Sequence, residues 1–166
     1  MVTRSRPSQD NAALLATLQA SGFEFVVIGG VAAVLHGSTR MTIDLDVCAP
    51  FDPANIDRLL EALAPHRPVH ATRPDLSLLD EPPERLRQFR LFLIQTSLGR
   101  LDVLRDVEPI GDYRAIERVE VTVSGMQVPI IARKQLITVK RAVGRPKDRE
   151  VALELELAEE SEREEP

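Results

Sequence analysis

Cysteine and tryptophan are nearly missing from this chain. Its 166 residues contain one cysteine, Cys48, and no tryptophan, and aromatic residues make up only 4% of the composition. A single cysteine excludes an internal disulfide bond, so we expect a protein of a reducing, cytoplasmic compartment. A domain of this length can bury roughly two-thirds of its unfolded surface, so folding requires neither a disulfide nor a structural metal.

Long apolar runs and metal-binding histidine patterns are also missing. No apolar run approaches the ~20 residues that a membrane helix needs. Residues 1–11 have no apolar signal-peptide core, so we expect an intracellular protein without a membrane partner. The three histidines, His36, His66 and His70, share no ligand spacing with Cys48. Nor does the sequence contain a Ser–His–Asp ordering that would indicate a nucleophilic triad.

The formal net charge of −5 is distributed unevenly. Residues 154–166 contain seven Glu and one Arg, a charge of −6, so the rest of the chain carries about +1. Residues 133–149 contain seven Lys or Arg and one Asp, a charge of +6. A basic segment favours a polyanionic ligand, although a solvated helix face would have the same composition. We expect the acidic end to be a helix end that frays, or a tail.

The pattern of apolar residues predicts strands and helices that alternate without regular βαβ spacing. We therefore expect an α+β fold, with one mixed sheet and helices packed on it, as a single domain over residues 1–153. Strands are predicted at 25–28, 43–48, 89–96, 101–104, 119–123 and 126–131, and helices at about 10–21, 31–36, 53–63, 134–143 and from 147 onward. The proline-rich stretch 65–83 is predicted to be irregular, apart from a short strand near residues 69–70.

Two carboxylates stand out in the predicted strand 43–48. Asp44 and Asp46 share one face, whereas Ile43, Leu45 and Val47 share the other. Adjacent like charges repel and are costly to bury, so such a pair indicates a positive group between them. A hard divalent cation such as Mg²⁺ suits these ligands. The alternative is an edge strand whose polar face meets water.

Features that suit phosphate binding surround this pair. Gly29-Gly30 lies between a predicted strand and a predicted helix, where backbone N–H groups can approach an anion. A plain strand-to-helix turn with no ligand would have the same sequence pattern. The polar loop 38–42 follows and carries one cation, Arg40. Downstream, Asp102 lies between Leu101 and Val103, where it either joins the two aspartates or faces solvent.

These residues carry a resemblance to a known group of enzymes. The stretch 27–47 resembles the signature of the DNA polymerase β-type nucleotidyltransferase superfamily, and Asp102 falls where that superfamily places its third carboxylate. The stretch 136–148 is similar to bacterial AbiEii-like nucleotidyltransferases, which are often toxins of toxin–antitoxin pairs. This chain departs from both patterns, with Gly30 where Ser is common, Val151 where a second Asp is common, and a shorter length. The matching positions in 27–47 are Gly29, Gly30, Ala32, Gly37, Arg40, Thr42, Asp44 and Asp46.

The resemblance implies a function and a set of roles. A nucleoside monophosphate would pass from a nucleoside triphosphate to an acceptor, which could be RNA such as tRNA, a protein or a small molecule. Mg²⁺ or Mn²⁺ would be the cofactor, and an antitoxin or helical protein a possible partner. A catalytically silent nucleotide-binding regulatory module and a nucleic-acid-binding domain built on 133–149 are the alternatives. The implied catalytic and metal ligands are Asp44, Asp46 and Asp102, and the implied phosphate ligands are Gly29, Gly30, Arg40, Thr42 and Lys140, although Lys140 would also suit a plain helix surface.

Overall fold

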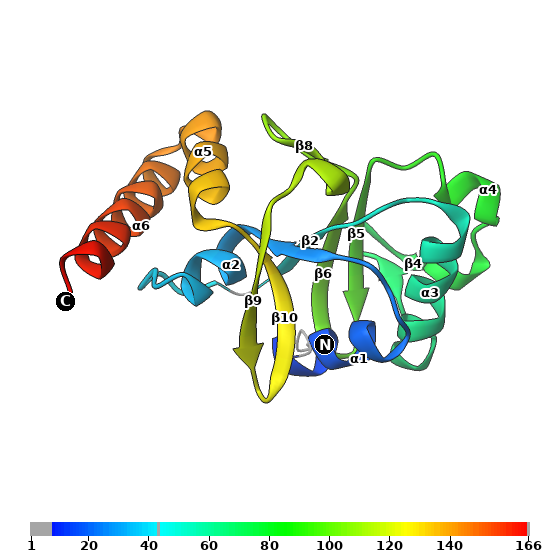
Figure 1. The fold of residues 1–166 in the computed structure, drawn as a ribbon. Helices are drawn as coiled ribbons and strands as arrows, with labels where there is room; N and C mark the ends of the chain where they lie inside the picture. Colours follow the sequence, from blue (N-terminus) through cyan, green and yellow to red (C-terminus); the bar gives the residue numbers. More distant parts are fainter. Residues whose placement is uncertain (1–7, 43, 166) are drawn as a thin grey trace, which may run out of the picture.

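The computed structural model describes residues 8–42 and 44–165, and within them it contains one eight-stranded mixed sheet (Figure 1). The strand order is β4-β3-β5-β6-β2-β1-β10-β9, and β7 pairs with β8 in a separate hairpin. The pairs β2–β6 and β1–β10 are parallel, and the other pairs are antiparallel. The strands are β1 Val26–Ile28, β2 Leu45–Cys48, β3 Val69–His70, β4 Arg73–Ser77, β5 Leu91–Thr96, β6 Gly99–Leu104, β7 Asp106–Val107, β8 Gly111–Asp112, β9 Arg118–Val123 and β10 Met126–Ile131.

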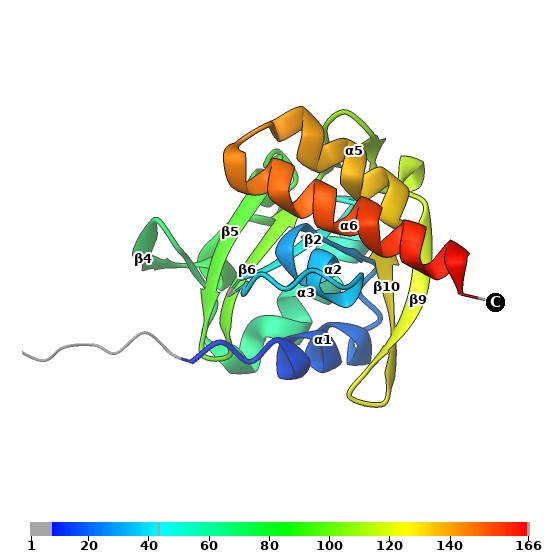
Figure 2. The ribbon, with the colours of Figure 1, turned by 90° about the vertical axis from the view of Figure 1, so that its left-hand side faces the viewer.

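The helices form two groups around this sheet. One group is α1 packed on α3, and the other is α5 paired with α6, with α2 between α5 and strands β1 and β2. Figures 1 and 2 show α5 and α6 well away from α1. The helices are α1 Asn11–Ala20, α2 Gly29–Leu35, α3 Pro53–Leu63, α4 Pro83–Leu86, α5 Arg133–Val143 and α6 Pro146–Glu164, and short 3-10 turns lie at Ala64–His66, Leu78–Asp80 and Tyr113–Ala115.

The core lies around β1, which is the central strand of the β2-β1-β10 segment. All three residues of β1 are buried, because this continuous apolar run forms a strand that is covered on both faces. Burying each such side chain contributes roughly 1.5–3 kcal/mol. The predicted α+β class, with a mixed sheet and packed helices, is therefore confirmed.

A buried amide ties α3 to the start of β1. Asn55 is fully buried and accepts a hydrogen bond from the N–H of Glu24 at 2.8 Å. Its Nδ2 donates to the carbonyls of Glu24 at 3.0 Å and Pro50 at 2.9 Å. Helix α3 begins as predicted, because Asp52 caps it through the N–H of Asn55 and proline occupies the first turn. These bonds fix the start of β1 and the end of β2, at the opposite ends of these strands from Gly29 and Asp46.

The structure corrects several sequence predictions. Strand β2 begins at Leu45, so Asp44 lies in a bend just before it, and Ile43 lies outside the described residues. Cys48, at the end of the same strand, is fully buried: its thiol donates a hydrogen bond to the carbonyl of Arg105 at 3.6 Å, and burial raises its pKa to about 12. The short strand predicted near residues 69–70 is confirmed as β3, but the rest of 65–83 is not irregular, because β4 pairs antiparallel with β3 and extends the sheet.

The acidic segment beyond residue 153 belongs to α6, which continues through Glu164. Its carboxylates bind other elements. Glu154 accepts hydrogen bonds from the backbone N–H and the hydroxyl of Thr39, both at 3.0 Å, and Glu162 pairs with Arg133 at 2.8 Å. In the part of the chain that the structure describes, no helix combines the length and apolarity needed to cross a bilayer.

Candidate nucleotide-binding site

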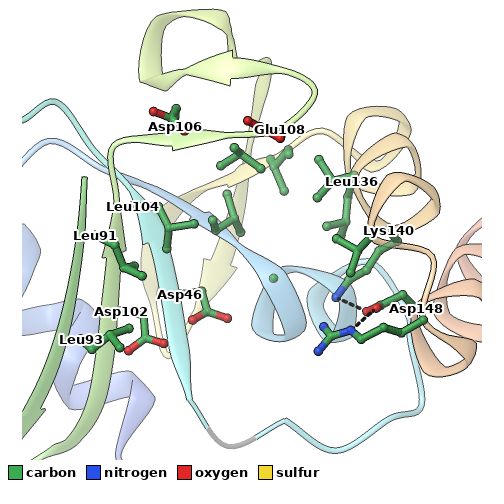
Figure 3. A pocket seen from close by; sticks show the side chains of 17 residues that line it. Asp46, Leu91, Leu93, Asp102, Leu104, Asp106, Glu108, Leu136, Lys140 and Asp148 are labelled. Atoms are coloured by element: carbon green, nitrogen blue, oxygen red, sulfur yellow. Dashed lines mark hydrogen bonds and ion pairs between the residues drawn. The ribbon is translucent and has the colours of Figure 1, made fainter. Parts of the chain in front are cut away.

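Strands β2 and β6 bring two of the predicted carboxylates together. In each strand the flanking residues are buried, namely Leu45 and Val47 in β2, so the aspartate between them points away from the core. The parallel register pairs Asp46 directly with Asp102. Figure 3 shows both carboxylates at the same wall of a cavity. The sequence predicted that these groups would meet, and the pairing of the strands gives the geometry.

The environment of Asp46 disfavours its ionised form. Burial and the nearby charges of Asp102 and Asp44 raise the pKa of Asp46 to about 7, and the charge of Lys140 opposes part of this rise. The carboxyl group of Asp102 can also accept a hydrogen bond from a protonated Asp46, which favours the protonated form as well. Asp102 also accepts a bond from Nε of Arg100 at 2.6 Å. The negative charge of Asp102 is therefore balanced by Arg100, whereas that of Asp46 is less well neutralised.

The two glycines allow close backbone approach to this pair. Gly29 has φ +65°, and a Cβ there would lie 2.5 Å from Oδ2 of Asp46. A Cβ on Gly30 would overlap the Thr42 side chain. Any side chain at position 30 would therefore displace Thr42. Helix α2 begins at Gly29 itself, two residues earlier than the sequence predicted.

Two cavities meet at Asp46. The larger, of about 490 Å³, is floored by Asp46 and Asp102 and has mainly aliphatic walls from β5, β6 and α5 (Figure 3). The smaller, of about 250 Å³, is polar. The two share Asp46, Lys140, Arg145 and Asp148. The smaller cavity is also lined by Gly30, Ser38, Arg40, Thr42 and Lys147.

Lys140 reaches the cavities from α5. It follows the buried Leu136 by one helical turn, so its aliphatic stem lies along the buried face of the helix. Its side chain is 16% exposed and its Nζ lies 3.5 Å from Oδ1 of Asp148. The alternative interpretation of Lys140, as a solvated helix-surface lysine, does not agree with this burial.

Asp148 ends the stretch 136–148 that carries the resemblance, but the sequence analysis assigned it no role in the site. It is 2% exposed, and its Oδ2 accepts a bond from Nε of Arg145 at 2.7 Å. Burial alone would raise the pKa of Asp148, but the hydrogen bond from Arg145 and the charges of Lys140 and Arg145 outweigh burial and lower it. The sequence feature that could have indicated its role is that it is the single acidic residue of the basic segment 133–149.

The other predicted ligands are only partly assembled. Thr42 and Arg40 line the smaller cavity, but Arg40 is ion-paired with the exposed Glu150 of α6. Among the described residues, Asp44 does not line either cavity, although its charge acts on Asp46. Within residues 8–42 and 44–165, no three Asp, Glu, His or Cys side chains are close enough to hold a metal ion as they stand.

The basic segment 133–149 does not form a free basic stripe. Four of its cations pair with carboxylates carried by α6, which neutralises much of its charge. This pairing weakens the interpretation of the segment as a nucleic-acid-binding face. The four cations are Arg133, Lys140, Arg141 and Arg145, and their partners are Glu162, Asp148, Glu156 and again Asp148.

Comparison with solved structures finds a similar fold in one described as an antigenic nucleotidyltransferase-like protein from Paracoccidioides brasiliensis. The TM-score is 0.56 at 15% sequence identity, and the match covers 90% of this chain and 77% of the other. At that identity the likeness establishes the fold alone. No protein-family model matches the chain, and no curated protein matches it.

Proposed function

We propose that this protein is a nucleotidyltransferase, which transfers a nucleoside monophosphate from a nucleoside triphosphate to a hydroxyl group of an acceptor. The observation that carries the proposal is the facing pair Asp46 and Asp102, beside the side-chain-free backbone at Gly29 and a cation-lined cavity. The likeness in fold to a nucleotidyltransferase-like protein supports it.

Each part of the site has a role in this reaction. Lys140 and Arg40 would neutralise the triphosphate in the smaller cavity, with the backbone of Gly29 and Gly30 and the hydroxyl of Thr42 around it. The acceptor oxygen would bond to the α-phosphorus as the bond to the β-phosphate oxygen breaks, and pyrophosphate would leave. Asp102 would accept the proton of the acceptor hydroxyl.

The donor set fits a hard divalent cation. The facing carboxylates of Asp46 and Asp102, with Asp44 nearby, offer the oxygen ligands that Mg²⁺ and Mn²⁺ prefer. Their mutual repulsion, seen in the raised pKa of Asp46, is what a bound cation would relieve. Such an ion would stabilise charge on the phosphate oxygens.

The decisive experiment incubates the purified protein with each labelled nucleoside triphosphate, Mg²⁺ and total cellular RNA. We expect label to move to RNA, to protein or to a small molecule with the wild type, and not with Asp44→Asn or Asp46→Asn. Asp75→Asn is the matched control, because this carboxylate pairs with Arg73 on the exposed strand β4. Equal transfer by Asp46→Asn and the wild type would overturn the assignment.

A catalytically silent nucleotide-binding module is the second candidate. The observation that favours it is the state of Asp102, which is held by Arg100 at 2.6 Å, together with the lack of a ready three-carboxylate group among the described residues. Metal-dependent nucleotide binding without transfer of label, in the same incubation, would identify this function instead.

The AbiEii-like resemblance extends the proposal to a toxin–antitoxin role with a small partner protein. The supporting feature is the stretch 136–148, whose Lys140, Arg145 and Asp148 meet at the two cavities. Co-expression with the product of the adjacent gene tests this role. We expect the partner to suppress growth inhibition caused by the wild type, and Asp46→Asn to cause no inhibition. Growth inhibition by Asp46→Asn equal to that of the wild type would remove the toxin role.

A further inference from the structure

Asp148 occupies an unusual position for a charged residue. It is almost completely buried, it lies in the first turn of α6, and it joins two cations that line both cavities. A carboxylate in the first helical turn is favoured by the helix dipole, which fixes its place. Asp148 thus connects the two helices of the α5–α6 pair at the point where they reach the cavities.

We propose that Asp148 is a positioning residue for a polyphosphate subsite formed by Lys140 and Arg145. This inference rests on the proposed function and adds Arg145 to the cations that would contact the triphosphate. Asp148 uses one oxygen for each cation, at 3.5 Å for Nζ of Lys140 and 2.7 Å for Nε of Arg145. Both long side chains are thereby held beside the two cavities before a ligand binds.

The two cations differ in how much they need this support. The side chain of Lys140 is 16% exposed, so protein atoms already restrict it. The side chain of Arg145 is 60% exposed, and it would sample many rotamers without its bond to Asp148. Ordering a rotamer-rich side chain before binding removes that entropic cost from the binding step. Arg145 should therefore depend on Asp148 more than Lys140 does.

A plain counter-charge role makes the opposite prediction. Asp148 is negative and lies beside the cavity, so removing its charge would strengthen anion binding if charge were its only effect. If Asp148 acts by positioning, removing its charge releases both cations and weakens anion binding. The sign of the change therefore separates the two roles.

The test is calorimetric titration of the full chain with inorganic tripolyphosphate in the absence of metal. We expect Asp148→Asn to weaken binding about tenfold, the low end of the scale for losing a hydrogen bond to a charged group. Lys140→Gln and Arg145→Gln should each weaken tripolyphosphate binding as well. In each of these variants Asp148 keeps one charged partner, so we expect the variant to fold. Asp148→Glu, which keeps the charge, should recover part of the affinity. Glu156→Gln is the matched control on α6, because Glu156 pairs with Arg141 rather than with the two subsite cations.

Three outcomes would overturn this inference. The first is that Asp148→Asn binds tripolyphosphate more tightly than the wild type does. The second is that Lys140→Gln and Arg145→Gln both bind it as tightly as the wild type. The third is that the Glu156→Gln control loses as much affinity as Asp148→Asn. The proposed function is tested separately, because tripolyphosphate binding requires no nucleotide transfer. A protein that binds tripolyphosphate as predicted but transfers no label would retain the polyphosphate subsite and lose the enzymatic assignment.

Discussion

The stability of the metal-free protein at different pH values tests the carboxylate pair directly. Burial and the charges of Asp102 and Asp44 raise the pKa of Asp46 from 3.8 to about 7. The folded protein therefore holds a proton on Asp46 more tightly than the unfolded chain does. The resulting stability is fully present below pH 4 and is lost as the pH rises through 7. Each pKa unit is worth about 1.4 kcal/mol, so the loss is about 4 kcal/mol at most.

Asp46→Asn removes the titrating charge while nearly keeping the shape of the side chain. With a chelator present, we expect its free energy of unfolding to match the wild type near pH 4 and to exceed it by up to about 4 kcal/mol at pH 8. Urea denaturation followed by circular dichroism at pH 4, 6 and 8 measures this difference. Subtracting the wild-type curve cancels the titrating groups that do not interact with Asp46.

Two results would refute the reasoning. A difference between Asp46→Asn and wild type that is the same at pH 4 and pH 8 would mean that Asp46 is not held against Asp102. Failure of Mg²⁺ to stabilise the wild type at pH 8 more than Asp46→Asn would remove the argument that a cation relieves the repulsion. Asp75→Asn serves as the control, because it removes a carboxylate from an exposed strand.

Three further substitutions test how the site is supported. Gly29→Ala should destabilise the fold by about 1–3 kcal/mol in thermal unfolding, because φ is +65° and the new Cβ would collide with Asp46. Asn55→Ala should cost about 2–3 kcal/mol by leaving buried backbone groups unpaired, and should lower Tm by about 5–10 °C in calorimetry. Glu154→Gln should leave global stability unchanged but speed tryptic cleavage after Arg40, since Glu154 binds Thr39 in that loop.

Local patterns predicted much of the fold because they depend on neighbouring residues. The helix α3 and the strands β1, β9 and β10 were each predicted from a few adjacent residues. Strand β4 was missed because its residues are mostly exposed and include Pro74, so it lacks the alternating apolar pattern of a half-buried strand. Its pairing with β3 supplies the order that its composition does not indicate.

The candidate site depends on contacts between distant segments, which local sequence patterns predict less well. Alternation placed Asp46 and Asp102 on the non-core faces of two strands, but only the parallel register of β2 and β6 sets them opposite each other. Asp148 was missed because its burial results from the packing of α6 on α5, which no local pattern in a basic segment predicts. Likewise, the sequence gives no sign that Arg40 pairs with Glu150.

The distribution of charge in the site argues for a ligand rather than for a structural role. A domain selected only for stability would gain by replacing Asp46 with Asn, because the ionised carboxylate is unfavourable beside Asp102 at neutral pH. Yet the nearby cations Lys140 and Arg145 are held by Asp148 at the other wall of the cavity, and they do not pair with Asp46. Among the described residues, Asp46 at one wall has no ion-pair partner and the cations at the other wall are fixed, which suits a ligand that carries both signs. A divalent cation bound to a polyphosphate has that combination, with the metal at the carboxylates and the phosphates at the cations.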